Sequence, residues 1–290
     1  MASTSFGVPA GSSEDPSPES VGPSQTWVKG AKIRKGAIGE VYLGMDLLTG
    51  GLEAIEEIHS SSLPVLAGNQ QDALELLRRK VNGLKSTLSH ENVVKIFDVF
   101  YYGEDIALNI YMEYIPGGSV AGLIRSYGGF EEALAKNFAA QIFQALQFLH
   151  DDANLAHGDL KAENVLVDNK GSIKAGHGVD RLEARKSRWM SPETVITSKF
   201  EEKGDIWSAG CVIIEMSTGK APWGDISDEE AISMISEGLQ PPFPDRDCSQ
   251  LLNKFMRVVF VIDPGVRPSA TLALLEDWFQ PPDKGATGVQ

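Results

Sequence analysis

The chain has 290 residues, of which 42% are hydrophobic, and its 26 basic and 40 acidic side chains give a net charge of −14. Such an excess of acidic groups argues against a protein whose main task is to neutralise nucleic-acid phosphates or anionic lipid headgroups. No apolar run approaches the roughly 18 residues that a membrane span requires, so we expect a cytoplasmic protein with no nucleic-acid partner and no membrane span.

The two ends of the chain differ in composition from its centre. Residues 1–25 contain few large apolar side chains, whereas Ser, Pro and Gly are frequent. Such a segment cannot bury enough apolar surface to offset the entropy lost on ordering. We therefore predict a disordered leader over residues 1–25, a folded domain over 26–280 and a short tail over 281–290.

The first part of the domain has the pattern of a small sheet. Five short segments rich in β-branched and aromatic residues are bounded by turn-forming residues, and these segments are 27–33, 38–46, 52–59, 93–103 and 106–115. Between the third and the fourth, apolar residues recur at helical spacing from Leu74 to Leu88, with Asp72 placed to cap a helix. The pattern predicts a β-rich lobe over residues 26–115 that is crossed by a single helix.

Beyond Pro116 the apolar residues follow a helical period instead. One stripe consists of Leu134, Phe138, Ile142, Ala145 and Leu149, and the run 205–218 is apolar almost all round, as in a buried helix. Further amphipathic helices are predicted over 228–237, 249–259 and 269–279, and two strand-like pieces over 164–169 and 171–176. We predict a larger, mainly helical lobe over residues 116–280.

The motifs follow one another in a recognisable order. A Gly-rich hairpin, a hinge reading MEYIPGGSV, a loop reading His157-Gly158-Asp159, a helix beginning Asp205-Ile206-Trp207 and a segment GVRPSATLALLEDW occur in turn. Over residues 27–280 this order of motifs resembles the protein kinase fold. The sequences of the motifs are similar to those of fungal mitogen-activated protein (MAP) kinase kinase kinases. The resemblance implies an α+β, two-lobed fold and an ATP and magnesium site between the lobes. It also implies partners among the other kinases or scaffold proteins of a MAP kinase cascade.

The resemblance assigns nucleotide contacts to nine positions, namely Ile33, Gly36, Gly39, Val41, Ala54, Met112, Glu113, Ile115 and Leu166. Val41, Ala54 and Leu166 match the residues that enclose the adenine base. Met112 precedes the hinge, whose backbone groups form hydrogen bonds with that base in the family. The Gly-rich loop keeps two of its three glycines, because Arg34 replaces the first. An alternative stays open, in which these glycines only shape a hairpin and the apolar residues only fill a core.

The catalytic loop of the family is retained at its main positions. The resemblance implies that Asp159 orients the substrate hydroxyl, that Lys161 steadies the transferred phosphate and that Asn164 binds magnesium. The alternative reading is that Asp159 and Asn164 serve only loop hydrogen bonds, because Asp and Asn side chains stabilise tight backbone turns.

Other catalytic positions are changed. Glu56 stands where the family has the phosphate-binding Lys, Val81 where it has the Glu partner of that Lys, and Gly176 where it has the magnesium-binding Asp. A carboxylate 4 Å from a phosphate charge costs about 4 kcal/mol at an effective dielectric near 20. Magnesium prefers carboxylate and phosphate oxygens, which Gly176 does not offer. We therefore predict weak ATP binding and little or no magnesium binding.

The structural landmarks, by contrast, are kept. Glu193 and Arg267 match the buried ion pair of the family's larger lobe. The sequence therefore predicts a pseudokinase that acts as a binding or scaffold module in a signalling cascade. One alternative is a Ser/Thr kinase that uses Arg34 or Lys35 as a substitute cation. Another is a decayed duplicate or a flawed gene model. The gene model is in question because only twelve residues, 179–190, separate Gly178 from Ser191-Pro192-Glu193.

Overall fold

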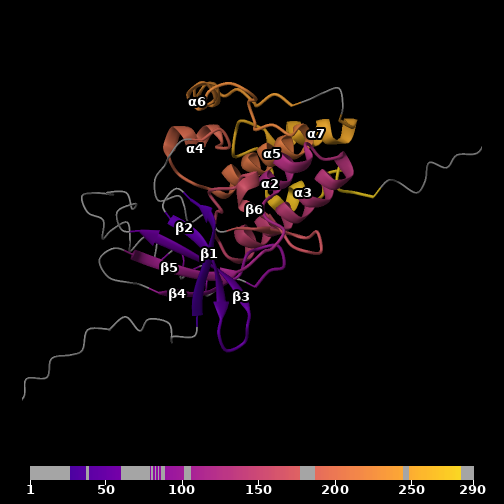
Figure 1. Ribbon diagram of the computed structural model, residues 1–290. Helices are drawn as coiled ribbons and strands as arrows, with labels where there is room; N and C mark the ends of the chain where they lie inside the picture. Colours follow the sequence, from indigo (N-terminus) through magenta and orange to yellow (C-terminus); the bar gives the residue numbers. More distant parts are fainter. Residues whose placement is uncertain are drawn as a thin grey trace, which may run out of the picture.

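The computed structural model describes residues 27–36, 39–59, 89–100, 106–176, 187–243 and 248–281, together with positions 79, 81, 83 and 85. Within these ranges a sheet lobe is followed by a helical lobe, drawn in indigo to purple and in magenta to yellow in Figure 1. The predicted α+β, two-lobed architecture is therefore confirmed. The predicted leader and residues 282–290 of the predicted tail lie outside the described residues.

The first lobe is an antiparallel five-stranded sheet in the order β1-β2-β3-β5-β4. Its strands are β1 (Trp27–Lys35), β2 (Gly39–Asp46), β3 (Leu52–His59), β4 (Ile96–Phe100) and β5 (Ile106–Glu113), as the alternating segments predicted. At Gly39 an added Cβ would lie 2.3 Å from the carbonyl oxygen of Glu57, so any side chain there would separate β2 from β3. Gly39 is thus required by the sheet itself.

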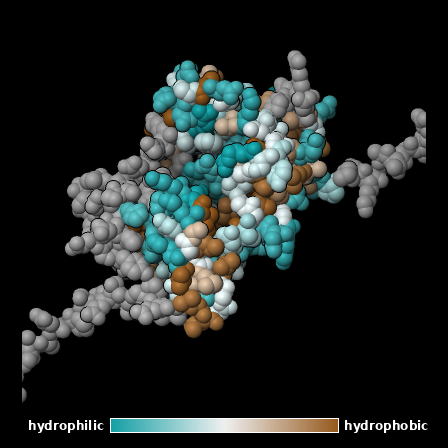
Figure 2. Space-filling view, viewed as in Figure 1, coloured by the Kyte–Doolittle hydropathy of each residue, from teal (hydrophilic) through white to brown (hydrophobic). Residues whose placement is uncertain are grey.

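The far end of this lobe is apolar at its surface. Figure 2 shows hydrophobic residues gathered there, where the turn between β2 and β3 exposes Leu47, Leu48 and Leu52. Of the predicted crossing helix, positions 79, 81, 83 and 85 are helical, and the rest, Asp72 included, lies outside the described residues. Val81 is fully buried and packs in the core of the sheet lobe with Ile58 and Met112.

The second lobe contains the predicted helices and two that the sequence pattern missed. The elements are α2 (Val120–Tyr127), α3 (Glu132–Gln147), α4 (Pro192–Thr197), α5 (Glu202–Thr218), α6 (Asp228–Ser236), α7 (Gln250–Val259), α8 (Ala270–Ala273), β6 (Val165–Val167) and β7 (Ile173–Ala175). The helices α2 and α4 were not predicted because each is too short to show an apolar period. None of the helices in the described ranges is long and apolar enough to cross a membrane.

Two details of the helical pattern were wrong. Leu134 is 43% exposed, because it lies in the first turn of α3, outside the reach of the core that buries the rest of the stripe. The helix predicted over 269–279 ends at Ala273. From there the backbone N–H groups of Leu275 and Glu276 bond to the third residue before them, which is a sequence of turns and not an α-helix.

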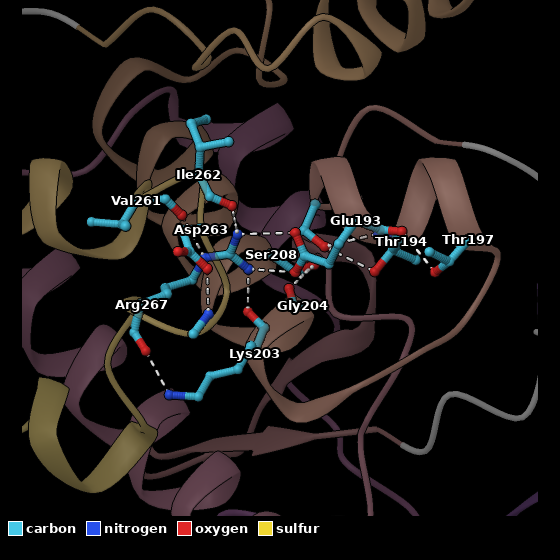
Figure 3. A network of polar contacts seen from close by, with 12 residues as sticks. Glu193, Thr194, Thr197, Lys203, Gly204, Ser208, Val261, Ile262, Asp263 and Arg267 are labelled. Carbon is cyan, nitrogen blue, oxygen red and sulfur yellow. Dashed lines mark hydrogen bonds and ion pairs between the residues drawn. The ribbon is translucent and has the colours of Figure 1, made fainter.

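An ion pair buried at the base of the second lobe joins α4 to the segment before α8. Arg267, whose side chain is fully buried, donates from Nη1 and Nη2 to the Glu193 carboxylate at 2.6 and 3.0 Å (Figure 3). The same guanidinium also donates to the carbonyl oxygens of Val261, Lys203 and Ile262. Every edge of the guanidinium is thus engaged, which is the condition under which a buried charge is tolerated.

The central helix α5 is buried along nearly its whole length and contacts the loop 157–164 through Glu215. Glu215 Oε1 accepts hydrogen bonds from the Trp189 indole at 2.5 Å and from the Ala162 backbone N–H at 3.3 Å. Burial, opposed in part by these hydrogen bonds, raises the pKa of the Glu215 carboxyl to about 7. The carboxyl is therefore neutral in the folded protein at mildly acidic pH.

We predict that Arg267→Ala destabilises the protein by about 3–5 kcal/mol, because it leaves the Glu193 carboxylate without its buried cation. Thermal and urea unfolding followed by circular dichroism measures this. The matched control is Lys254→Ala, which removes a cation from the exposed ion pair with Asp277 and should change stability little. Asp159→Ala should also cost less than Arg267→Ala. If Arg267→Ala unfolds like the wild type, the Glu193–Arg267 pair does not stabilise this lobe.

A second prediction concerns pH. Because the folded-state pKa of Glu215 is raised, its neutral form contributes stability that is complete below about pH 4.5 and is lost as the pH rises through about 7. Glu215→Gln keeps the Oε1 acceptor and stays neutral, so its stability relative to wild type should rise by about 3 kcal/mol between pH 4.5 and pH 8. Urea unfolding of both proteins at several pH values tests this. A constant difference across that range would contradict it.

Candidate active site

A cleft with a cavity volume of about 450 Å³ lies between the two lobes. Such a volume lies within the range of small-molecule sites. Eight of the nine positions predicted to contact a nucleotide line it, and these are Ile33, Gly36, Val41, Ala54, Met112, Glu113, Ile115 and Leu166. The ninth, Gly39, does not line the cleft. The close approach of Gly39 to Glu57 gives this glycine a role in the packing of β2 against β3.

The inner end of the cleft is apolar and flat. Ala54 on β3 lies opposite Met112 on β5 in the sheet register, and both are 7% exposed. Val41 and Leu166 pack against the same cluster from the two lobes. Within the described part of the chain the backbone N–H of Ile115, at the hinge, has no hydrogen-bond partner. An apolar slot with a free backbone donor at its edge suits a heteroaromatic base.

The three predicted catalytic residues are brought together at the outer end. Asn164 Nδ2 donates to the backbone oxygen and to Oδ2 of Asp159, each at 2.8 Å, and Lys161 Nζ lies 3.3 Å from the same Oδ2. Arg34, on β1 of the other lobe, donates from Nη1 to Asn164 Oδ1 at 3.0 Å. The amide of Asn164 is thus bonded at both its nitrogen and its oxygen, and the contact with Arg34 spans the cleft.

The loop that bears these residues is held from below by Asp205, at the start of α5. Its carboxylate accepts from the backbone N–H groups of His157 and Gly158 at 2.7 and 2.8 Å and contacts His150 Nε2 at 2.9 Å. Burial raises the pKa of Asp205, but the His150 contact and the backbone donors outweigh it and hold the pKa below the usual range. A carboxylate that is ionised at neutral pH therefore holds the start of the loop.

Gly158, in the same loop, has a positive φ of 76°. A Cβ built there would meet Phe200 at 3.4 Å, which is ordinary contact, so the backbone conformation and not space favours glycine.

One wall of the cleft contains the carboxyl group of Glu56. Glu56 on β3 lines the cleft, is 3% exposed and lies opposite Val41 in the sheet. The position from which the family's helix Glu would reach this strand is held by the buried apolar side chain of Val81. At the two positions that the resemblance assigns to the family's Lys–Glu pair, this chain has Glu56 and Val81.

The described residues do not fit a magnesium ion. Gly176 has no side-chain oxygen, and its N–H donates to the backbone oxygen of Asn164 at 2.8 Å. The remaining predicted ligand, Asn164 Oδ1, accepts from the positive Arg34 guanidinium. Among the residues that the structure describes, no group of three or more His, Cys, Asp or Glu side chains could hold a metal.

Sequence reasoning missed two residues that line the cleft. Ser119 caps α2, accepting from the Gly122 N–H at 3.1 Å, and Arg125 on the same helix is exposed at the rim. Both belong to α2, which was not predicted. The signal that could have found them is Pro116-Gly117-Gly118-Ser119 followed by apolar residues, a helix start with Ser as its N-cap.

The segment that follows Gly176 is described only from Ser187 onward. The end of this segment is held by contacts of Arg188. Arg188 pairs with Asp228 at 2.6 Å and donates to the carbonyl oxygens of Gly224 and Ile226. These contacts join the end of the segment to the start of α6.

Comparison with known proteins agrees with the geometry. The protein kinase domain profile matches residues 27–279. The chain is 34% identical to the serine/threonine-protein kinase STE11 of Saccharomyces cerevisiae, over 90% of the chain and 43% of that protein. It is 35% identical to the mitogen-activated protein kinase kinase kinase MST11 of Pyricularia oryzae, over 88% of the chain and 30% of the relative. It is also 35% identical to mitogen-activated protein kinase kinase kinase 2 of Arabidopsis thaliana, over 86% of the chain and 40% of the relative.

The chain spans less than half the length of each of these relatives, so the similarity concerns one domain of each. In this chain the matched residues 27–279 include the sheet lobe, the cleft and the helical lobe described above. The chain belongs to the protein kinase domain family, and its sequence is similar to those of MAP kinase kinase kinases from fungi and plants.

Proposed function

We propose that this chain is a pseudokinase domain of the MAP kinase kinase kinase type, which acts by binding within a kinase cascade and not by phosphoryl transfer. The observation that supports this most directly is Glu56, a buried carboxylate in the wall of the cleft where a phosphate-binding cation is needed. Its partners would be other kinases or scaffold proteins of such a cascade, in line with the names of its relatives.

The physical argument rests on how phosphoryl transfer is catalysed. The protein contributes almost only positioning and charge stabilisation, so the cations around the phosphates supply most of the rate. In this chain the phosphate-binding Lys of the family is replaced by Glu56, which has the opposite charge. The magnesium-binding Asp is replaced by Gly176. At 4 Å and an effective dielectric near 20, exchanging attraction for repulsion changes the interaction by about 8 kcal/mol before screening.

A second candidate is an active Ser/Thr kinase with a rewired phosphate grip. The contact of Arg34 with Asn164 favours it, because it places a cation beside the three retained catalytic positions. A decayed duplicate is a weaker alternative, since the buried contacts of Asp205 and Arg267 are complete. A flawed gene model would not explain single substitutions inside intact strands, such as Glu56 within β3.

The proposal predicts the result of repairing the site. Glu56→Lys supplies a cation and Gly176→Asp a metal ligand. An added Cβ at Gly176 would lie 3.1 Å from the Asn164 backbone oxygen, so Gly176→Asp requires that backbone to shift by a few tenths of an ångström. Because residues of a catalytic unit are not additive, each single repair should return little activity and the double more than both together. Radiolabelled phosphate release from ATP measures this, and we expect slow hydrolysis or autophosphorylation, because Val81 leaves the new Lys without its partner.

Two controls make the assay decisive. Asp159→Ala in the repaired background should abolish the gained activity, and Glu91→Lys, at an exposed position outside the cleft, tests for a mere effect of net charge. Wild-type activity equal to that of the double repair, and abolished by Asp159→Ala, would show that the protein is an enzyme and that the proposal is wrong.

A further inference from the structure

Five large apolar side chains are exposed together at the far end of the sheet lobe (Figure 2). We call them the apolar end surface, and they are Val28, Met45, Leu47, Leu48 and Leu52, each between 42% and 79% exposed. In the sheet register Val28 lies opposite Met45 and Met45 opposite Leu52, so these three form one row across β1, β2 and β3. Leu47 and Leu48 lie in the turn directly beyond the row. The surface is therefore contiguous, and contiguous exposed apolar surfaces mark interaction sites.

The row has the spacing of one face of a helix. Neighbouring strands lie about 4.8 Å apart, and successive turns of a helix rise by about 5.4 Å. A helix that lies across the strands can thus place one apolar side chain on each residue of the row. The strands β2 and β3 are already paired on both sides, so an added strand cannot pair with their backbones. A helix therefore fits this surface better than an extended peptide.

The charges beside the apolar end surface are acidic. Asp46 and Glu53 each directly follow a residue of the row, and neither forms an ion pair with a described residue. Asp46 Oδ1 accepts instead from the backbone N–H groups of Leu48 and Thr49 at 2.7 and 3.1 Å. Glu53 Oε2 is buried and has no hydrogen bond to any residue that the structure describes. This end of the lobe thus has two carboxylates without a cation.

The surroundings of Glu53 show the same lack of a cation. Burial, together with the charges of Asp46 and Asp98, raises the pKa of the Glu53 carboxyl to about 7. The other charged groups that face it from β1, β4 and β5 are already in ion pairs, namely Lys29 with Glu57, Asp98 with Lys85 and Glu113 with Lys174. A cation brought by a partner would therefore be attracted to this end, most strongly above about pH 7.

We propose that the apolar end surface is a docking site for an amphipathic helix of another protein, which places apolar side chains on the row and Lys or Arg side chains beside it. The net charge of −14 disfavours two other occupants, because a second copy would bring the same excess of negative charge and an anionic membrane would repel the chain. The surface lies outside the lining of the cleft. The inference therefore goes beyond the proposed function and does not depend on what the cleft binds.

The test uses a fluorescein-labelled model helix of about 18 residues, or five turns, with Leu along one face and Lys elsewhere. A matched peptide has Glu in place of Lys. Fluorescence anisotropy measures the binding of each peptide to the full chain at pH 8, where Glu53 is largely ionised. We expect the Leu–Lys peptide to bind at least roughly tenfold more tightly than the Leu–Glu peptide, because only the first has the complementary charge.

Two leucine variants test the apolar contact. Leu48→Ser with Leu52→Ser should weaken binding of the Leu–Lys peptide by about tenfold or more, because less apolar area is buried on docking. Both side chains are exposed, so the variant should keep the fold. The matched control is Leu272→Ser with Leu275→Ser, which removes two exposed leucines from the helical lobe and should leave binding unchanged.

Two charge variants test the acidic groups. Asp46→Asn with Glu53→Gln keeps the shapes of both side chains and the Oδ1 acceptor in the turn. It should weaken binding of the Leu–Lys peptide by about threefold or more and make that binding less dependent on salt. The matched control is Asp225→Asn with Glu229→Gln, at exposed positions in the helical lobe, which should change neither quantity.

The inference is overturned if the Leu–Lys peptide binds equally to the two leucine variants, because it would then be attracted only by the overall negative charge. It is also overturned if sedimentation velocity shows a dimer that Leu48→Ser with Leu52→Ser dissociates, which would make a second copy the occupant. Flotation of the wild type, but not of that variant, with phosphatidylserine vesicles would overturn it in favour of a membrane. None of these results concerns phosphate release from ATP, so failure here and failure of the proposed function are distinguishable.

Discussion

The carboxylate of Asp205 is the point on which the geometry of the cleft depends. It is fully buried at the start of α5 and holds the backbone of His157 and Gly158 directly ahead of Asp159. A buried, ionised acceptor with three donors fixes a loop far more strictly than apolar packing does, because any displacement leaves a charge unpaired. The start of the loop that bears Asp159 is therefore held in one conformation by Asp205.

The second lobe and the cleft have thus diverged to different degrees. The contacts that stabilise the lobe, among them the Glu193–Arg267 pair and the hydrogen bonds to Glu215, are complete. In the cleft, the apolar slot for a base is intact, whereas the charges around the phosphate position are rearranged. Because the residues that stabilise this lobe are not those that line the cleft, a change of charge in the cleft need not lower the stability of the fold.

Much of the fold followed from local pattern. The five strands were evident from alternating apolar residues bounded by turns, and α5 from an apolar run of helical length. Short helices such as α2 were not predicted, because an apolar stripe is recognisable only over more than two turns. The helix α8 was predicted too long, because apolar residues in consecutive turns have a spacing similar to that of a helix.

The candidate site divides in the same way. Its residues could be named from motif order, and eight of nine nucleotide positions do line one cleft. The contact between Arg34 and Asn164 could not be predicted, since it joins two lobes across a distance in sequence that no local pattern encodes. The role of Gly39 was also hidden, because the close approach of Glu57 is a property of the sheet register.

The central claim is that this protein has a complete kinase fold but binds ATP weakly and without magnesium. Thermal unfolding in saturating ATP, with magnesium and with EDTA, tests it most directly, because a ligand that binds only the folded state raises stability by mass action. The account predicts weak stabilisation that is the same in both conditions. A magnesium-dependent gain above about 2.7 kcal/mol, the value for a hundredfold excess over the dissociation constant, would contradict it.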